Sequence, residues 1–219
     1  MEIVYTKNYE EMSRKAAITI AQQIISKPSS VLGFATGSTP IRTYEILVEF
    51  YQRGIVDFSN INTFNLDEYV GLDSHHHQSY SFFMYKYLFN HIHLDSNRIH
   101  LPCGTAADLK NECTQYEEAI QRLGGIDLQL LGIGSNGHIG FNEPGTRLNS
   151  VTHIVSLTKE TIQANARFFA TPEEVPQRAI TMGIKTIMNC KKILLLVSGT
   201  RKAKIIQQAL SGPITEDLP

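Results

Sequence analysis

The sequence predicts an α/β fold: one Rossmann-like domain over residues 1–219, with a mostly parallel sheet covered by helices on both faces. Two observations carry this prediction. Short apolar runs typical of strands alternate with amphipathic helical segments, and no repeat, low-complexity tract or linker divides the chain. A chain of 219 residues is also long enough to bury a core without a disulfide or a structural metal. In such folds, ligands bind at the carboxyl ends of the strands.

Hydrophobic spacing and cap residues predict the individual elements. The first helix is expected over residues 9–26, because Asn8 is a typical N-cap with Glu11 three residues later and apolar residues then recur at helical spacing. Further helices are expected over 40–54, 79–90, 108–123 and 201–210. Strands are expected over 31–35, 61–66, 98–101, 126–133 and 191–197.

Composition excludes several classes of protein. Lys and Arg number 20 against 21 Asp and Glu, so no basic field would attract a nucleic acid or an anionic membrane. The apolar run 193–197 is far shorter than the ~20 residues that span a bilayer. The N-terminus lacks a secretory signal, and Cys103, Cys113 and Cys190 are widely spaced without a C-x-x-C pair. These features predict a cytoplasmic protein without a thiolate metal site.

The loop after the first predicted strand is suited to an anion. Thr36, Gly37, Ser38 and Thr39 precede Pro40, which opens the second predicted helix. Backbone N–H groups at a helix N-terminus, with hydroxyl groups beside them, can hold a phosphate. No Gly-Lys-Ser/Thr follows, so a monophosphate suits this loop better than a nucleotide. An ordinary turn with Thr39 as the N-cap remains an alternative.

The loop predicted over residues 67–71 follows the strand 61–66. Asp67 is a candidate general base there, because partial burial raises the pKa of a carboxyl group; a solvated loop acid is the alternative. The run His75 to His77 is interpreted as solvated, since three consecutive side chains do not easily converge on one metal ion. His91 and His93 are interpreted in the same way.

The glycine-rich segment 132–145 contains one imidazole and one carboxylate. Residues 132–137 match G-x-G-x-x-G, but glycines and a proline soon afterwards break any helix, so a dinucleotide site is rejected. His138 and Glu143 are five residues apart and form a candidate proton-transfer pair. A histidine satisfied within its loop is the weaker alternative.

Taken together, these segments resemble one enzyme family. The segments that carry the resemblance are 35–40, 64–71, 132–144, 164–169 and 199–203. They are similar in order and spacing to those of the glucosamine-6-phosphate deaminases, within the glucosamine/galactosamine-6-phosphate isomerase family. The resemblance implies an α/β enzyme that converts glucosamine 6-phosphate and water to fructose 6-phosphate and ammonium, in amino-sugar catabolism. It implies no metal and no organic cofactor.

The resemblance also implies a role for each matching residue. His138 would open the pyranose ring with support from Glu143, and Asp67 would take the proton from C2 to give an enolamine. The matching phosphate-binding residues are Thr36, Gly37, Ser38, Thr39, Arg167 and Lys202, with Arg167 on a lid-like segment.

The chain departs from the family pattern in two places. Asn136 stands where many members have an aspartate, and we expect its amide to support ring opening by hydrogen bonding. Allosteric members carry basic residues in the region matching 146–155, where this chain has His153 and Val155. We therefore expect no activation by N-acetylglucosamine 6-phosphate, and a monomer or small homo-oligomer.

The chain ends at residues 215–219, where members of the family usually continue into one more strand. A truncated sequence and a natural short end are both compatible with this.

Rival functions are a 6-phosphogluconolactonase or galactosamine-6-phosphate isomerase of the same fold, and a non-catalytic sugar-phosphate sensor. A lactonase would lack the Asp-Glu-Tyr-Val-Gly element at 67–71. A sensor would be expected to have lost Asp67, His138 or Glu143.

Overall fold

A five-stranded, entirely parallel sheet forms the centre of the molecule. The computed structural model describes residues 1–167, 169 and 171–218. The strand order is β4-β2-β1-β5-β8, and every neighbouring pair is parallel. These strands are β1 (Val31–Phe34), β2 (Asn62–Asn65), β4 (Ile99–His100), β5 (Leu128–Gly132) and β8 (Ile193–Leu196).

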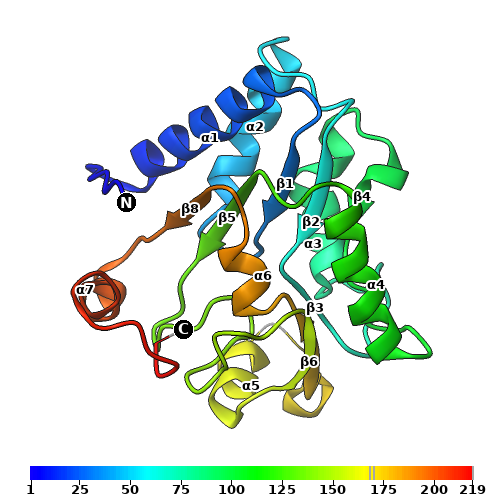
Figure 1. Cartoon of the computed structure of the whole chain (residues 1–219), viewed down its shortest axis with the longest axis vertical. Coiled ribbons are helices and arrows are strands. Elements are labelled where there is room, and N and C mark those ends of the chain that lie inside the picture. Colours follow the sequence, from blue (N-terminus) through cyan, green and yellow to red (C-terminus); the bar gives the residue numbers. More distant parts are fainter. Residues whose placement is uncertain (168, 170, 219) are drawn as a thin grey trace.

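Helices cover both faces of this sheet (Figure 1). The α-helices are α1 (Tyr9–Ser26), α2 (Ile41–Gln52), α3 (Tyr80–Tyr87), α4 (Leu109–Arg122), α5 (Lys159–Ala166), α6 (Ile184–Met188) and α7 (Ala203–Ser211). Short 3₁₀ helices lie at Phe89–His91, Ser96–Arg98, Pro172–Glu174 and Thr200–Lys202. The predicted fold class is confirmed.

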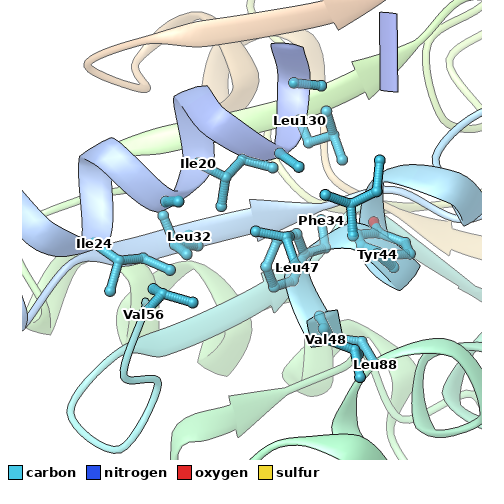
Figure 2. Close-up of a cluster of buried hydrophobic side chains, with 14 of the residues drawn as sticks. Ile20, Ile24, Leu32, Phe34, Tyr44, Leu47, Val48, Val56, Leu88 and Leu130 are labelled. Atoms are coloured by element: carbon cyan, nitrogen blue, oxygen red, sulfur yellow. The ribbon is translucent and has the colours of Figure 1, made fainter. Parts of the chain in front are cut away.

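Alternation along β1 divides the core into two clusters. Leu32 and Phe34 face α1 and α2, where Ile20 and Leu47 are fully buried against them (Figure 2). Val31 belongs to the opposite cluster, with residues of α4 and α6. Successive strand residues point to opposite faces, so a strand buried on both sides reads as a continuous apolar run.

The sequence-based helices and strands of the central sheet agree with the structure to within a few residues. Asn8 caps α1 and accepts a hydrogen bond from the Glu11 N–H at 2.9 Å. Ser79 and Asp108 likewise cap α3 and α4 with their side chains. The last helix, predicted over 201–210, begins later than expected. Residues 200–202 form a 3₁₀ turn, and the α-helix begins at Ala203.

A second, three-stranded antiparallel sheet was not expected. Its order is β3-β7-β6, with β3 (Asp67–Tyr69), β7 (Arg178–Thr181) and β6 (His153–Ser156). The prediction of a loop over 67–71 is therefore wrong for residues 67–69. In Figure 1, β3 and β6 lie with α5 beyond the carboxyl ends of β1 and β2. This sheet forms a floor at the edge of the central sheet where ligands bind in such folds.

Asp127 ties together three segments at the start of the central sheet. Its Oδ2 accepts from Lys27 Nζ at 2.7 Å and from the Val31 N–H at 2.8 Å, while Oδ1 accepts from Lys191 Nζ at 2.7 Å. The core is thus fixed on the side away from the site. None of the described helices is long and apolar enough to cross a membrane.

Candidate active site

A cavity of about 1210 Å³ opens beside the carboxyl ends of β1 and β5. It brings together most of the residues that the sequence singles out, although they come from widely separated segments. Those that line it are Thr36, Gly37, Ser38, Thr39, Asp67, Asn136, His138, Arg167 and Lys202. Glu143 is not among the lining residues and lies behind Asn136 and His138, in contact with both.

The loop after β1 leads directly into α2. Pro40 is the N-cap of this helix, and the cap makes no side-chain hydrogen bond. The alternative in which Thr39 caps the helix is therefore wrong. The loop places its hydroxyl-bearing residues on the cavity wall next to the positive end of a helix.

Two tyrosines that the sequence analysis missed hold this loop. Tyr44 of α2 is fully buried and donates from its hydroxyl to the Ala35 carbonyl at 2.5 Å. Tyr9 of α1 donates to the Ser38 carbonyl at 3.1 Å and accepts from the Arg42 N–H at 3.2 Å. No spacing motif marks these residues, because each acts on backbone atoms reached only in the folded chain.

Asp67 begins β3 and is only 6% exposed. Burial, followed by the neighbouring charge of Glu68, raises the pKa of the Asp67 carboxyl from 3.8 to about 8. Gly140 packs close by with φ of 60°, and a Cβ there would lie 3.2 Å from Asp67 Oδ2 and 2.9 Å from Thr181 Oγ1. Glycine at this position therefore leaves room beside the carboxylate.

Glu68 has a structural role and is not a candidate base. Its carboxylate accepts from the N–H groups of Tyr69, Tyr80 and Ser81 at 2.8–2.9 Å, and so ties β3 to the first turn of α3. Burial raises the pKa of Glu68, and these three donors oppose the shift. The two adjacent acids thus differ: one fixes a helix and the other faces the cavity.

An aromatic wall stands beside Asp67. Tyr80 and Phe141 stack with ring centres 5.9 Å apart and an interplanar angle of 8°, and Tyr69 contacts both rings. Phe169 packs on Tyr69 with ring centres 6.1 Å apart. All four line the cavity. These side chains exclude water from the carboxylate, which explains the direction of its pKa shift.

His138 and Glu143 lie close together. Nδ1 of His138 is 3.6 Å from Glu143 Oε2 and has no hydrogen-bond partner within the described chain. Burial lowers the pKa of His138; Glu143 acts in the opposite direction, and Lys202 adds to the lowering. Gly134 makes this position possible, because a Cβ there would clash with the imidazole ring. The neutral imidazole is the form that can accept a proton.

The Asn136 side chain makes two hydrogen bonds within this loop. Its Nδ2 donates to Glu143 Oε2 at 2.6 Å, and its Oδ1 accepts from the backbone N–H of His138 at 3.2 Å. The amide therefore holds the carboxylate and the loop, and it acts on the ring through them.

Two cations complete the cavity wall. Arg167 is the C-cap of α5, and Lys202 ends the 3₁₀ turn before α7. Burial lowers the pKa of Lys202. Phe168, in the segment 164–169 that contributes to the resemblance, lies outside the described residues. Among the described residues, no three His, Cys, Asp or Glu side chains gather as a metal site, and His75, His76 and His77 are exposed.

The fold and the site define a class of α/β proteins with a ligand cavity at the carboxyl edge of a parallel sheet. The chain belongs to the family of glucosamine-6-phosphate isomerases and 6-phosphogluconolactonases, whose model matches residues 7–219.

Curated relatives are similar to the chain over its whole length. A glucosamine-6-phosphate deaminase of Thermoanaerobacter sp. (strain X514) is 55% identical over 219 residues, which cover 100% of this chain and 87% of the relative. The deaminase of Clostridium novyi (strain NT) is 54% identical, with 100% of this chain and 91% of the relative covered.

Solved structures are also similar to the chain. A monomeric glucosamine-6-phosphate deaminase superposes with a TM-score of 0.97 at 49% identity, covering 100% of this chain and 91% of that one. A 6-phosphogluconolactonase from Thermotoga maritima superposes with a TM-score of 0.75 at 18% identity, covering 97% and 89%, and shares the fold.

The raised pKa of Asp67 predicts a stability change that depends on pH. Because the folded-state pKa lies above the unfolded value, the carboxylate destabilises the fold increasingly as pH rises from about 4 to about 8. Asp67→Asn should therefore raise the free energy of unfolding, by on the order of 2–5 kcal/mol near pH 9, with a smaller gain at low pH.

Urea unfolding of both proteins at several pH values measures this difference. Asp217→Asn, at an exposed position, is the matched control. Equal stabilities of wild type and Asp67→Asn at high pH would show that Asp67 is not desolvated.

Proposed function

We propose that the chain is a glucosamine-6-phosphate deaminase, which converts glucosamine 6-phosphate and water to fructose 6-phosphate and ammonium. The observation that carries this proposal is that Asp67 and His138 open into one cavity whose wall also holds the 36–39 loop and Lys202. The names of full-length relatives at 54–55% identity support it.

His138 is suited to opening the sugar ring. In its neutral form the imidazole accepts the proton of the C1 hydroxyl, the C1–O5 bond breaks as the C1 carbonyl forms, and O5 receives the proton. Glu143, 3.6 Å from Nδ1, stabilises the charge that develops on the ring. The lowered pKa keeps the base neutral at physiological pH.

Asp67 is suited to the next proton transfer. Its carboxylate takes the proton from C2 of the open-chain amino sugar, which leaves an enolamine. Return of a proton to C1 gives an imine at C2, and water then releases ammonia and leaves the ketone. The aromatic wall of Tyr69, Tyr80 and Phe141 keeps bulk water from this carboxylate.

The phosphate provides an anchor remote from the reacting carbons. Thr36, Gly37, Ser38 and Thr39 form the loop that leads into the N-terminus of α2, and Arg167 and Lys202 supply positive charge. Binding energy gained there can be used to orient C1 and C2 against His138 and Asp67.

The cellular setting is also part of the proposal. The three widely spaced, free cysteines support work in the reducing cytoplasm. The likeness to a monomeric deaminase at 49% identity supports a monomer or small homo-oligomer.

The proposed activity predicts ammonia release from glucosamine 6-phosphate without added metal or cofactor. Asp67→Asn should reduce kcat by about 10²–10⁴-fold, because the amide cannot accept the C2 proton. A coupled ammonia assay measures the activity of the wild type and the kcat of Asp67→Asn. Galactosamine 6-phosphate and 6-phosphogluconolactone are run in parallel, and lactone hydrolysis without ammonia would favour the rival lactonase.

Asn136 is expected to support ring opening through Glu143. Asn136→Ala removes a hydrogen bond to a charged group and should lower kcat on the closed-ring substrate by about 10–100-fold, with a smaller change in KM. Asn90→Ala, at an exposed site, is the control. Unchanged turnover of Asn136→Ala would remove Asn136 from the mechanism.

We also propose that N-acetylglucosamine 6-phosphate does not activate the enzyme. His153 donates from Nδ1 to the Val151 carbonyl at 2.7 Å, and Val155 packs with the aromatic wall, so both positions have structural contacts. Saturation curves should be hyperbolic and should coincide with and without this sugar. A sigmoidal curve that the sugar makes hyperbolic would contradict the proposal.

A further inference from the structure

Helix α5 contacts the acid–base pair as well as the cavity. Thr161, in its first turn, donates from Oγ1 to Glu143 Oε1 at 2.6 Å. The other carboxylate oxygen accepts from Asn136 at 2.6 Å. Each oxygen of Glu143 therefore has one short, directed hydrogen bond, and together they fix the plane of the carboxylate behind His138.

The hydroxyl of Thr161 is itself oriented by the start of α5. Thr158 is the N-cap and accepts from the Thr161 N–H at 3.1 Å. The Thr158 hydroxyl lies 3.1 Å from Thr161 Oγ1 and donates to it. With its lone pair engaged in this way, the Thr161 hydroxyl directs its proton to Glu143, and the chain of hydrogen bonds strengthens each member.

The other end of α5 reaches different parts of the cavity. Asn165 donates from Nδ2 to the Tyr69 hydroxyl at 2.9 Å, on the aromatic wall beside Asp67. Arg167 caps the helix and lines the cavity with Thr161 and Asn165. One short helix thus connects the cationic wall to the carboxylate behind His138.

We propose that Thr161 is a positioning residue for ring opening, which holds Glu143 in the orientation that lets it support His138. This inference rests on the proposed deaminase function and deepens it. With Oε1 held by Thr161, Oε2 is the atom that faces Nδ1 at 3.6 Å. A proton on Nδ1 then points to Glu143 and leaves the Nε2 lone pair as the base.

Loss of the Thr161 hydroxyl leaves the Glu143 carboxylate held by Asn136 alone, so its plane is no longer fixed. The imidazole then loses its fixed tautomer and the nearby charge that stabilises its protonated form. Within the described part of the structure, Asp67 has no hydrogen bond to Thr158, Thr161, Glu143 or Asn136, so proton transfer at C1 and C2 should be much less affected. Ring opening and enolamine formation therefore become separable.

Thr161→Val tests the inference, because valine matches the shape of threonine and lacks the hydroxyl. Its kcat for ammonia release from closed-ring glucosamine 6-phosphate should fall about 10–100-fold, with little change in KM. Thr161→Ser should recover most of the activity. Thr114→Val, in which an exposed helical threonine of α4 is changed, is the matched control.

A partial reaction distinguishes positioning from a general loss of structure. In deuterated water with ammonium, exchange of the C1 hydrogens of fructose 6-phosphate uses Asp67 but needs no opening of a pyranose ring. The ratio of exchange rate to deamination rate should rise at least about 10-fold in Thr161→Val relative to wild type. This ratio does not depend on the folded fraction of the sample, so a partly unstable variant still gives an answer.

The outcomes separate this inference from the proposed function. An unchanged ratio in Thr161→Val, or a serine variant as impaired as the valine variant, would overturn the positioning role while the wild type still releases ammonia. Absence of both ammonia release and exchange in the wild type would instead overturn the proposed function.

Discussion

The desolvation of one carboxyl group, Asp67, is the constraint on which the site depends. The residue sits where β2 passes into β3, at the junction of the two sheets, and its backbone pairs with Thr181 of β7. An acid at this place is held by secondary structure and cannot move toward solvent. The aromatic wall then removes water from one side, while Gly140 keeps space open on the other. The second sheet lies at the carboxyl edge of the first. Because Asp67 is part of this sheet, its carboxyl group is buried there and not exposed in a loop.

Burial shifts the pKa values of the two proton-transfer groups, Asp67 and His138, in opposite directions. Burial raises the pKa of Asp67 to about 8 and lowers the pKa of His138, so both groups favour their neutral forms near pH 7. A neutral histidine is ready to act as a base. Asp67 needs a nearby positive charge to ionise, and in the proposed reaction the protonated amine of the amino sugar would supply it. The substrate would thus help to ionise the group that acts on it, which favours amino sugars over their neutral analogues.

Sequence patterns predicted the parts of the fold that local chemistry determines. The helices with Asn8, Ser79 and Asp108 as caps start where their cap residues predict, and the buried parallel strands are apolar runs. The strands β3, β6 and β7 have three or four residues each and mix polar with apolar side chains, so no alternation marked them. Their stability comes from pairing between separate segments, and β3 pairs with β7 more than a hundred residues along the chain, which local patterns do not encode.

In the site, too, local sequence patterns identify some residues and only the fold reveals others. The motif residues Asp67, His138 and Glu143 could be selected from their neighbours in sequence, and the structure brings them to one place. Tyr9, Tyr44 and Thr161 could not, because each acts through a hydrogen bond to a partner 29, 9 or 18 positions away. From sequence alone, a tyrosine in an amphipathic helix is interpreted as a packing residue, and only the structure shows that its hydroxyl donates to a carbonyl at Ala35 or Ser38. Long-range polar contacts of this kind need the fold before they can be assigned.

Asn136 shows how a departure from the family pattern fits this geometry. Its side chain lies 2.6 Å from Glu143 Oε2, a distance at which two ionised carboxylates would repel each other strongly. An aspartate in this position would need a proton to make the same contact, so its hydrogen bond would depend on pH. The amide always carries its donor. It therefore orients Glu143 without titrating itself, and Thr161 and Asn136 hold the two oxygens of that carboxylate beside His138.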